Sequence, residues 1–327
     1  MPHDPKGARL GSAIPSLTQL QYIVALHRTG HFGRAAAECQ VSQPTLSALV
    51  AKAEEEFGVQ IFDRRSKPVV ATEPGRALIA LAQEVLMAHE RLLVAASGTA
   101  QVTGHFTLGV IPTLAPYVLP WFLGPFCEQY PRVELTILER TTDSIVSELQ
   151  AMRMDAGLVA TPLGEPWLDG RVLFYDPFYV YAHPASPLLA LDEVGLADID
   201  RADLWLLDDG HCFRNQVVHL CGRHERQVLR SVQFEAGSFE TLRALIEQLG
   251  GFTLVPETYA RTLSPELRCS RVRPFQDPLP TREVSLVAHR GHWKTDILDA
   301  VAATLRSCAP RSLPREAGKQ EVLPVRR

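Results

Sequence analysis

Eight short runs rich in apolar and β-branched residues constrain the fold of this 327-residue chain more than any other feature. They lie at residues 106–111, 133–139, 156–161, 171–183, 204–208, 231–235, 252–255 and 284–289. Helical patterns separate several of these runs, and connections of that length favour parallel strands joined by crossover helices. We therefore expect an α/β fold from residue 106 onward.

The residues before this region carry the pattern of short helices. Ser16 and Gln19 fit a capping box at the start of the first one. A second helix is predicted over residues 32–40, and a third begins after Ser42. Pro44 suits the first turn of the third helix, where the N–H that proline lacks would be unpaired. Two such helices joined by a tight turn are typical of a helix-turn-helix, whose second helix can enter the major groove of DNA.

The exposed side of the third helix and the segment after it carry residue types that bind DNA. Gln43 can pair with adenine edges, and the hydroxyls of Thr45 and Ser47 can bond to bases. Residues 60–73 are predicted to form a two-stranded wing. Further basic side chains, suited to phosphates, are Lys52 on the helix and Arg64, Arg65 and Lys67 at the wing tip. The alternative is a small helical domain in which Ser42 is merely a cap and the wing a surface hairpin.

Charge does not decide between these alternatives. The net charge is −4, and residues 16–75 hold as many acidic as basic side chains. Residues 1–15 lack the apolar core of a signal peptide, and no run approaches the roughly 18 apolar residues of a membrane span. We expect a cytoplasmic protein without a membrane partner, with disordered tails at residues 1–15 and 309–327.

Residues 76–97 show an apolar repeat at alternating spacings of three and four, which predicts a dimerisation helix. Its seam consists of Leu78, Leu81, Val85 and Leu92, together with two alanines. A helix packed within the core of one subunit is the alternative. Residues 98–104 are expected to form a hinge.

Cys212 and Cys221, nine residues apart, flank a predicted short helix over residues 213–221. Such a helix separates their Cα atoms by about 13 Å, whereas a disulfide needs about 4.4–6.8 Å. The helix and the disulfide therefore exclude each other. Because Cys212 would lie at a helix N-terminus beside His211 and near Arg214, we expect its thiolate to be favoured.

Two roles without redox chemistry stay open for these cysteines. They could simply pack one face of the helix. They could also bind zinc with the nearby histidines, but known short sites pair ligands two to four residues apart. The possible ligands are His211, Cys212, His219, Cys221 and His224. We expect no metal and no other cofactor, and no other nucleophile–base arrangement indicates an enzyme.

Residues 32–36, 41–47, 55–59 and 62–64 closely resemble the N-terminal domain of LysR-type transcriptional regulators. The resemblance implies a winged helix-turn-helix domain at 16–75, a linker helix at 76–97 and a regulatory domain at 105–308. It implies two Rossmann-like α/β subdomains resembling a periplasmic binding protein, with subdomain I at 105–174 and 278–308 and subdomain II at 175–277. The residues that it implies for DNA contact are Arg34, Ser42, Gln43, Pro44, Thr45, Ser47 and the basic residues of the wing.

Residues 209–221, 111–120 and 238–243 also resemble the peroxide-sensing members of this family. This implies that Cys212 is the peroxidatic cysteine and Cys221 the resolving one. It assigns the support of bound peroxide to Thr113, Thr142 and His211, with Arg214 beside them. Asn215 departs from the pattern, because the better-known relatives have an aspartate there, so the charge of the loop differs.

Three classes of function follow. The leading one is a redox-controlled regulator of oxidative-stress defence genes that responds to hydrogen peroxide. Its implied partners are double-stranded promoter DNA, further copies in a homotetramer built as a dimer of dimers, RNA polymerase, and a glutaredoxin- or thioredoxin-type reductant. The second is a LysR-type regulator controlled by a small inducer in the cleft between the subdomains. The third is a thiol peroxidase, against which the DNA-reading helix argues.

Overall fold

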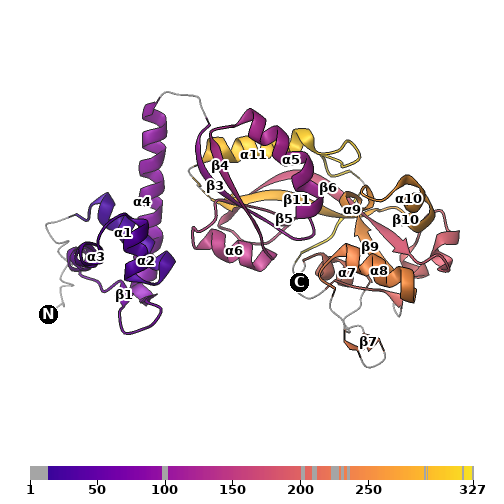
Figure 1. Ribbon diagram of the computed structural model, residues 1–327, viewed down its shortest axis with the longest axis horizontal. Coiled ribbons are helices and arrows are strands. Elements are labelled where there is room, and N and C mark those ends of the chain that lie inside the picture. Colours follow the sequence, from indigo (N-terminus) through magenta and orange to yellow (C-terminus); the bar gives the residue numbers. More distant parts are fainter. Residues whose placement is uncertain are drawn as a thin grey trace, which may run out of the picture. The chain divides into compact units, whose positions relative to one another are not determined.

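The computed structural model describes residues 14–97, 102–199, 203–207, 212–221, 228–229, 232–233, 236–290, 292, 294–318 and 320–325. Most of the expected N-terminal tail and the first part of the expected hinge lie outside these residues. The chain divides into two compact units, Met1–Ala100 and Gln101–Arg327 (Figure 1). Within the described residues, no helix combines the length and the apolar character that crossing a membrane requires.

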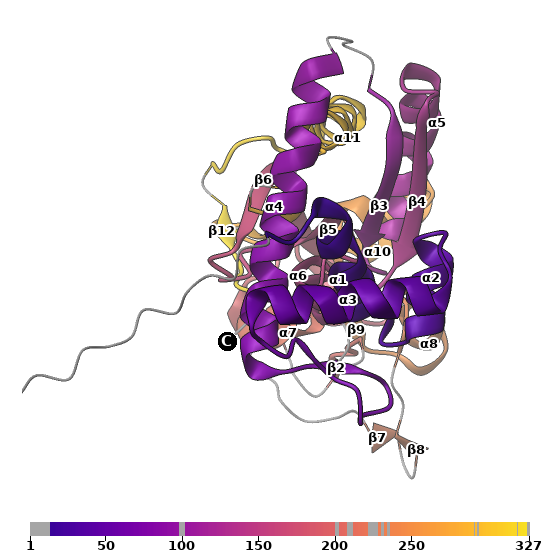
Figure 2. The ribbon, with the colours of Figure 1, turned by 90° about the vertical axis from the view of Figure 1, so that its left-hand side faces the viewer.

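The first unit is helical and carries a small hairpin. Its elements are α1 (Leu17–Thr29), α2 (Phe32–Glu38), α3 (Gln43–Phe57), β1 (Phe62–Asp63), β2 (Val70–Ala71) and α4 (Glu73–Ser97). The Ser16 side chain accepts from the backbone N–H of Gln19, and the Gln19 side chain accepts from that of Ser16, so the predicted capping box is confirmed. In Figure 2, α3 lies crosswise to the long axis of α4.

Apolar side chains from all these helices form the core of the first unit. Leu26 of α1 and Leu46 and Val50 of α3 are fully buried in it. Strand β1 pairs antiparallel with β2, with Phe62 opposite Ala71. This hairpin is the predicted wing.

The second unit is built on one mixed sheet. Its strands are β3 (Gly104–Val110), β4 (Val133–Glu139), β5 (Ala156–Thr161), β6 (Leu168–Ala182), β9 (Phe252–Pro256), β10 (Val272–Pro274), β11 (Pro280–His289) and β12 (Glu321–Val322). The order is β10-β6-β11-β5-β3-β4, while β9 also pairs with β6 and β12 with β11. Strand β3 is parallel to β4 and β5, but β6 and β11 run antiparallel to each other. The expected parallel pairing therefore holds for part of the sheet only, because these two long strands pass in opposite directions.

Helices cover this sheet on both sides. They are α5 (Ala115–Gln129), α6 (Thr142–Gln150), α7 (Cys212–Cys221), α8 (Phe239–Leu249), α9 (Glu257–Ala260), α10 (Pro265–Arg271) and α11 (Thr295–Cys308), with two 3₁₀ turns at Pro187–Ala190 and Leu196–Asp198. Figure 1 shows α5 and α11 on one side of strands β3, β5 and β11, and α6 on the other. Strands β7 (Val228–Leu229) and β8 (Val232–Gln233) form a separate hairpin.

Two hydrophobic cores divide the second unit into two α/β subdomains, as the predicted fold class requires. The first core includes Phe174 of β6 and Val284 of β11. The second includes Phe178, farther along β6, together with residues of α7, α8 and β9. Strand β6 thus contributes to both cores.

Two sequence-based expectations were wrong. Residues 204–207 form no strand but only isolated bridges, from Leu204 to Phe252 and from Leu207 to Ala236. The segment from residue 309, expected to be disordered, is packed onto the second unit: Leu313, Leu323 and Val325 are buried and β12 pairs with β11. Its apolar side chains follow no regular period, because each fills a separate gap.

Candidate redox site and DNA-binding surface

Helix α7 begins at Cys212 and ends at Cys221, so the two sulfurs lie at opposite ends of one short helix. Both cysteines are free thiols and both are buried. They belong to different cores, since Cys212 packs in the first core and Cys221 in the second. At about 1.5 Å per residue, their Cα atoms are separated by about 13 Å. A disulfide between them requires α7 to unfold.

The surroundings of Cys212 are partly polar. Thr142, the first residue of α6, is buried beside the sulfur, and its hydroxyl makes no hydrogen bond of standard geometry to the described residues. The positive charge of Arg282 on β11 also acts on this sulfur. Thr113 accepts a hydrogen bond at its Oγ1 from Arg282 Nη1, at 3.0 Å. Two threonines predicted to support peroxide thus lie close to Cys212 or to its charged neighbour.

The ionisation of Cys212 differs from the expectation. Burial raises the pKa of the Cys212 thiol above its ordinary value, while the Thr142 side chain and the Arg282 charge act in the opposite direction. The expected preference for thiolate is therefore wrong, because the N-terminus of α7 is buried rather than open to water. His211 lies outside the described residues, and Arg214 Nη1 donates to the Leu207 carbonyl at 3.0 Å.

A fully buried ion pair joins the two subdomains next to Cys212. Arg282 and Asp176 are both 0% exposed and approach to 2.8 Å. Arg282 also donates from Nε to Asp176 Oδ2 at 3.0 Å and from Nη2 to the Thr113 carbonyl at 3.1 Å. Asp176 accepts from both the backbone N–H and the hydroxyl of Thr258. A buried pair persists only when such additional hydrogen bonds satisfy both charges.

This pair was not predicted from the sequence. The available signal was weak: Asp176 and Arg282 are charged residues within predicted or observed strands, but both strands also hold other charged residues. Nothing in the sequence indicated that these positions, 106 residues apart, face each other.

An aromatic cluster connects Cys212 to the second core. Phe213 packs against Phe178 and Phe239, with ring centroids 4.7 and 5.0 Å apart. The Arg282 guanidinium carbon lies 5.4 Å from the centroid of the Phe213 ring, a distance at which cation–π attraction operates. The hydroxyl of Tyr117 on α5 donates to Glu240 at 2.9 Å, within the 238–243 motif. Any movement of α7 must disturb these contacts.

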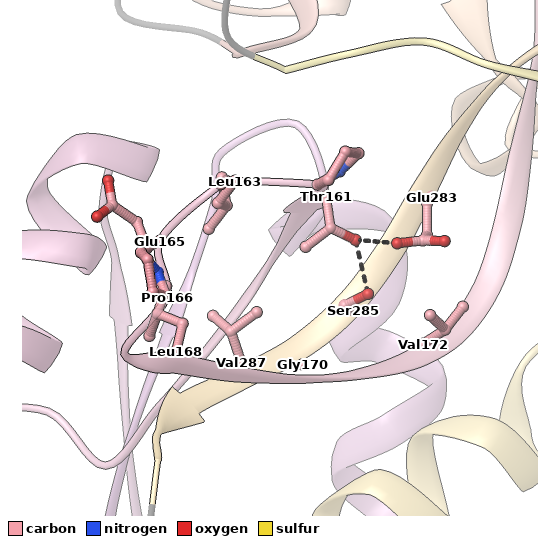
Figure 3. Close-up of a pocket in the computed structure, with 12 residues that line it drawn as sticks. Thr161, Leu163, Glu165, Pro166, Leu168, Gly170, Val172, Glu283, Ser285 and Val287 are labelled. Carbon is pink, nitrogen blue, oxygen red and sulfur yellow. Dashed lines mark hydrogen bonds between the residues drawn. The ribbon is translucent and has the colours of Figure 1, made fainter.

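A pocket of about 320 Å³ lies within the first subdomain (Figure 3). At its floor, the Thr161 hydroxyl donates to Glu283 at 2.6 Å and lies 2.7 Å from the Ser285 hydroxyl. Its lining residues come from 161–172 and 283–287. The pocket therefore does not match the inducer site expected between the two subdomains.

The predicted groove-facing residues lie at the start of α3. Ser42 caps the helix by accepting from the Thr45 backbone N–H, and the two hydroxyls are 2.7 Å apart. Gln43, Pro44 and Thr45 are exposed, and Ser47 is half-buried. These side chains lie at the N-cap and along the first turn and a half of α3, interrupted by the buried Leu46.

The basic residues differ in their surroundings. Arg65, Lys67 and Lys52 are exposed, with Lys52 3.7 Å from Glu56. Arg34 is exposed and donates to the Thr29 carbonyl at 2.8 Å. Arg64 instead pairs with Glu54 at 2.7 Å and lies over the Phe32 ring, so it is held by its own domain.

Helix α4 presents two apolar faces. Ile79 and Ala82 are buried against the first unit, and Leu78 is partly buried on the same side. By contrast, Leu81, Val85 and Leu92 are 56%, 47% and 66% exposed. Their spacing of four and seven residues is the heptad spacing of a coiled-coil seam. Of the four residues predicted for the dimerisation seam, Leu78 packs partly in its own domain, and Leu81, Val85 and Leu92 are exposed.

Metal-binding side chains are not grouped in the described residues: no three His, Cys, Asp or Glu are close enough to hold an ion. His211 and His224, which the zinc alternative needs, lie outside those residues. His219, on the exposed side of α7, lies within them, as does Asn215, which is also exposed.

Comparisons with known proteins match nearly the whole chain. Residues 17–76 match the bacterial regulatory helix-turn-helix domain of the lysR family, and residues 99–309 match the LysR substrate binding domain. A probable hydrogen peroxide-inducible genes activator of Streptomyces viridosporus is 35% identical over 304 residues, covering 92% of this chain and 96% of that protein. The DNA-binding transcriptional dual regulator OxyR of Escherichia coli K12 is 31% identical over 295 residues, covering 89% and 95%.

Solved structures show the same likeness. A full-length OxyR variant from Pseudomonas aeruginosa superposes with a TM-score of 0.76 at 32% identity, covering 90% of this chain and 99% of that one. A hydrogen peroxide-bound OxyR mutant from Corynebacterium glutamicum has a TM-score of 0.56 at 30% identity, covering 90% and 93%.

Proposed function

Since the chain belongs to the LysR family of bacterial transcription regulators, we propose that it senses hydrogen peroxide through reversible formation of a Cys212–Cys221 disulfide. In this proposal the disulfide changes how the protein binds promoter DNA and so controls oxidative-stress defence genes. The similarity to hydrogen peroxide-inducible activators over most of the chain supports this choice within the family.

One observation carries the proposal. Cys212 lies beside the charge of Arg282 and the buried hydroxyl of Thr142, which has no hydrogen bond of standard geometry to the described residues, while Cys221 lies at the far end of the same helix. A hydroxyl without a partner at a buried site can bond to a small polar molecule. The cationic guanidinium favours ionisation of the thiol when peroxide is present.

The chemistry follows from the two sulfurs. The Cys212 thiolate attacks one peroxide oxygen, the O–O bond breaks, and hydroxide leaves and takes up a proton to become water. Cys212 is then a sulfenic acid. The Cys221 thiolate attacks its sulfur, the S–O bond breaks, and a second water leaves as the disulfide forms. One peroxide is thus reduced while two thiols are oxidised, and a dithiol reductant of the glutaredoxin or thioredoxin type restores them.

The reaction is a signal rather than an enzymatic turnover in this proposal, because each oxidation must be reset by the reductant before the next. We infer a cytoplasmic location, because such reductants keep thiols reduced there. Burial raises the pKa of the Cys212 thiol, so its attack on peroxide depends on the two groups that favour the thiolate, the Thr142 side chain and the Arg282 charge.

The DNA-binding part of the proposal uses the exposed start of α3. Gln43, Thr45 and Ser47 would contact bases, while Arg34, Arg65 and Lys67 would contact phosphates. Arg64 would have to leave Glu54 to do the same. The exposed residues Leu81, Val85 and Leu92 of α4 would form the interface between two copies. Two such dimers would form the tetramer that binds promoter DNA and RNA polymerase.

We propose domain boundaries that differ from the expected ones where the elements differ. The winged domain spans 16–72, the linker helix 73–97 and the hinge 98–103, because α4 begins at Glu73 and β3 at Gly104. The regulatory domain runs from 104 to 325, since the tail is part of its cores.

The competing function is a LysR-type regulator that answers a small inducer. The two are separated by mapping proteolytic peptides of the peroxide-treated protein by mass spectrometry, together with a reporter strain that carries Cys212→Ser. We expect a Cys212–Cys221 cross-link lighter by two hydrogens, and a silent reporter. A Cys212→Ser strain that still responds to peroxide would reject the redox function and leave the inducer alternative.

A further inference from the structure

The segment at residues 309–325, here named the C-terminal strap, follows directly on the region matched to the LysR substrate binding domain, which ends at residue 309. It is the yellow end of the ribbon in Figure 1. The backbone N–H of Tyr175 donates to the Pro314 carbonyl at 2.8 Å. Further along, β12 pairs in parallel with the start of β11, and the Leu323 N–H donates to the Thr281 carbonyl at 2.9 Å. The strap is therefore bound to both long strands.

The strap also contributes to both cores. Leu313 and Val325 are buried in the first core, and Leu323 is buried in the second. The Leu323 N–H donates to the carbonyl of Thr281 on β11. The next residue of that strand is Arg282, whose charge acts on Cys212, so the strap contacts the strand beside the redox site.

One side chain ties the strap to the redox helix. Gln216 is fully buried in α7, and its Nε2 donates to the Leu323 carbonyl at 3.0 Å. Its Oε1 has no hydrogen-bond partner among the described residues. Among the described residues, the hydrogen bond to the strap is therefore the one that satisfies this buried side-chain amide.

Gln216 cannot keep this position if the disulfide forms. It lies four residues after Cys212 and five before Cys221. The disulfide requires the Cα–Cα distance between Cys212 and Cys221 to fall from about 13 Å to less than about 7 Å. The helix must therefore unfold, and it is this helix that directs the Gln216 side chain toward the strap. The amide then leaves the Leu323 carbonyl, and the apolar side chains around Leu323 lose the helix that covers them.

We propose that the C-terminal strap is a latch on the redox helix, which stabilises the dithiol form through Gln216 and is released when the disulfide forms. The latch rests on the proposed redox function. Coupling between two such elements is reciprocal, so loss of the strap contact favours the disulfide by the same factor by which the disulfide loosens the strap.

In the equilibrium test, the full-length protein is equilibrated with mixtures of reduced and oxidised dithiothreitol at a series of fixed ratios. The fraction with a Cys212–Cys221 disulfide is then measured by mass spectrometry. Gln216→Met keeps nearly the same volume but removes the donor without adding a charge. Since one hydrogen bond is lost, we expect the disulfide to be favoured about fivefold over the wild type. The control is Gln248→Met, on the exposed side of α8, with an unchanged equilibrium. A Gln216→Met equilibrium equal to the control would overturn the latch.

The second test needs no variant and so does not depend on whether a variant folds. Hydrogen exchange is compared between reduced and oxidised wild-type protein. We expect the amides of Glu321 and Leu323, which donate to β11 and the residue before it, to lose protection on oxidation, while amides of β3 do not. A complete disulfide with unaltered strap protection would overturn the latch alone. Absence of any Cys212–Cys221 disulfide would overturn the proposed function and the latch together.

Discussion

The two ends of α7 are buried to a similar degree, but their surroundings differ. Cys212 packs in the first core with Thr142 and the charge of Arg282 close by. Cys221 packs in the second core with the apolar residues of α8 and β9. A negative sulfur is stabilised by the groups at the first end, which suits the initial attack on peroxide. The two cysteines are therefore not interchangeable in the reaction with peroxide, although they belong to the same helix.

Replacing each cysteine in turn by serine should have the largest effect on the reaction with peroxide. Cys212→Ser should abolish the reaction with peroxide at α7, because the sulfur beside Thr142 and the Arg282 charge is gone. Cys221→Ser should still react at Cys212 and stop at the sulfenic acid or at a mixed disulfide with an external thiol. Intact-protein mass spectrometry with a sulfenic-acid trap measures both. Oxidation of Cys221 at the wild-type rate in the Cys212→Ser protein would show that the two ends are equivalent.

Removing the charge at the Cys212 end should destabilise the whole unit. Arg282→Met leaves Asp176 buried without its partner, which costs about 3–5 kcal/mol. The comparison is Arg243→Met, which removes a partly exposed partner of Glu247 and should cost about 0–1 kcal/mol. Urea unfolding curves give both free energies. Equal losses in the two variants would mean that the buried pair has no special role in holding the subdomains together.

The pH dependence tests the environment of Cys212 directly. Because burial raises its pKa, the thiolate fraction should still be increasing through neutral pH. The rate constant for the reaction with peroxide should rise about tenfold per pH unit from pH 6 to 8. Stopped-flow fluorescence or competition with a peroxidase measures it. A rate that is flat over this range would mean a lowered pKa, as the sequence alone had predicted.

The smallest effect is expected from the Thr142 hydroxyl. Thr142→Val keeps the shape but removes the hydroxyl beside the sulfur, so oxidation should slow about five- to tenfold, the effect of one hydrogen bond. Thr304→Val is the matched control, since this buried threonine bonds to the Ala300 carbonyl within α11. The two rates come from the same stopped-flow experiment. Slowing by both variants alike would assign the effect to general loosening of the first core.

Features that depend on neighbours in sequence could be predicted. The caps at Ser16 and Ser42, the wing and the bounds of β4 and β5 follow from local patterns. The placement of Cys212 and Cys221 at the two ends of a helix also followed from the spacing of apolar residues.

Features that depend on contacts between residues far apart in the sequence could not be predicted. The contact of Arg282 with Asp176 joins two strands far apart in the chain, and Cys212 is buried in the first core beside residues far from it in the sequence, such as Thr142 and Arg282. The strap was missed because an irregular segment becomes ordered only through the gaps that it fills. Its four buried apolar side chains, Ala309, Leu313, Leu323 and Val325, follow no regular spacing in the sequence.

The packing of α7 also has an electrochemical consequence in the proposed cycle. Phe213, Val217 and Val218 are buried on this helix, and exposing one such side chain costs about 1.5–3 kcal/mol. For a two-electron couple, about 1.4 kcal/mol corresponds to about 30 mV. Each side chain that leaves its core when the helix unfolds therefore raises the reduction potential of the disulfide by some tens of millivolts. Hydrophobic packing along α7 thus sets the reduction potential that an oxidant must exceed to form the disulfide, above that of the ordinary thiol–disulfide pool.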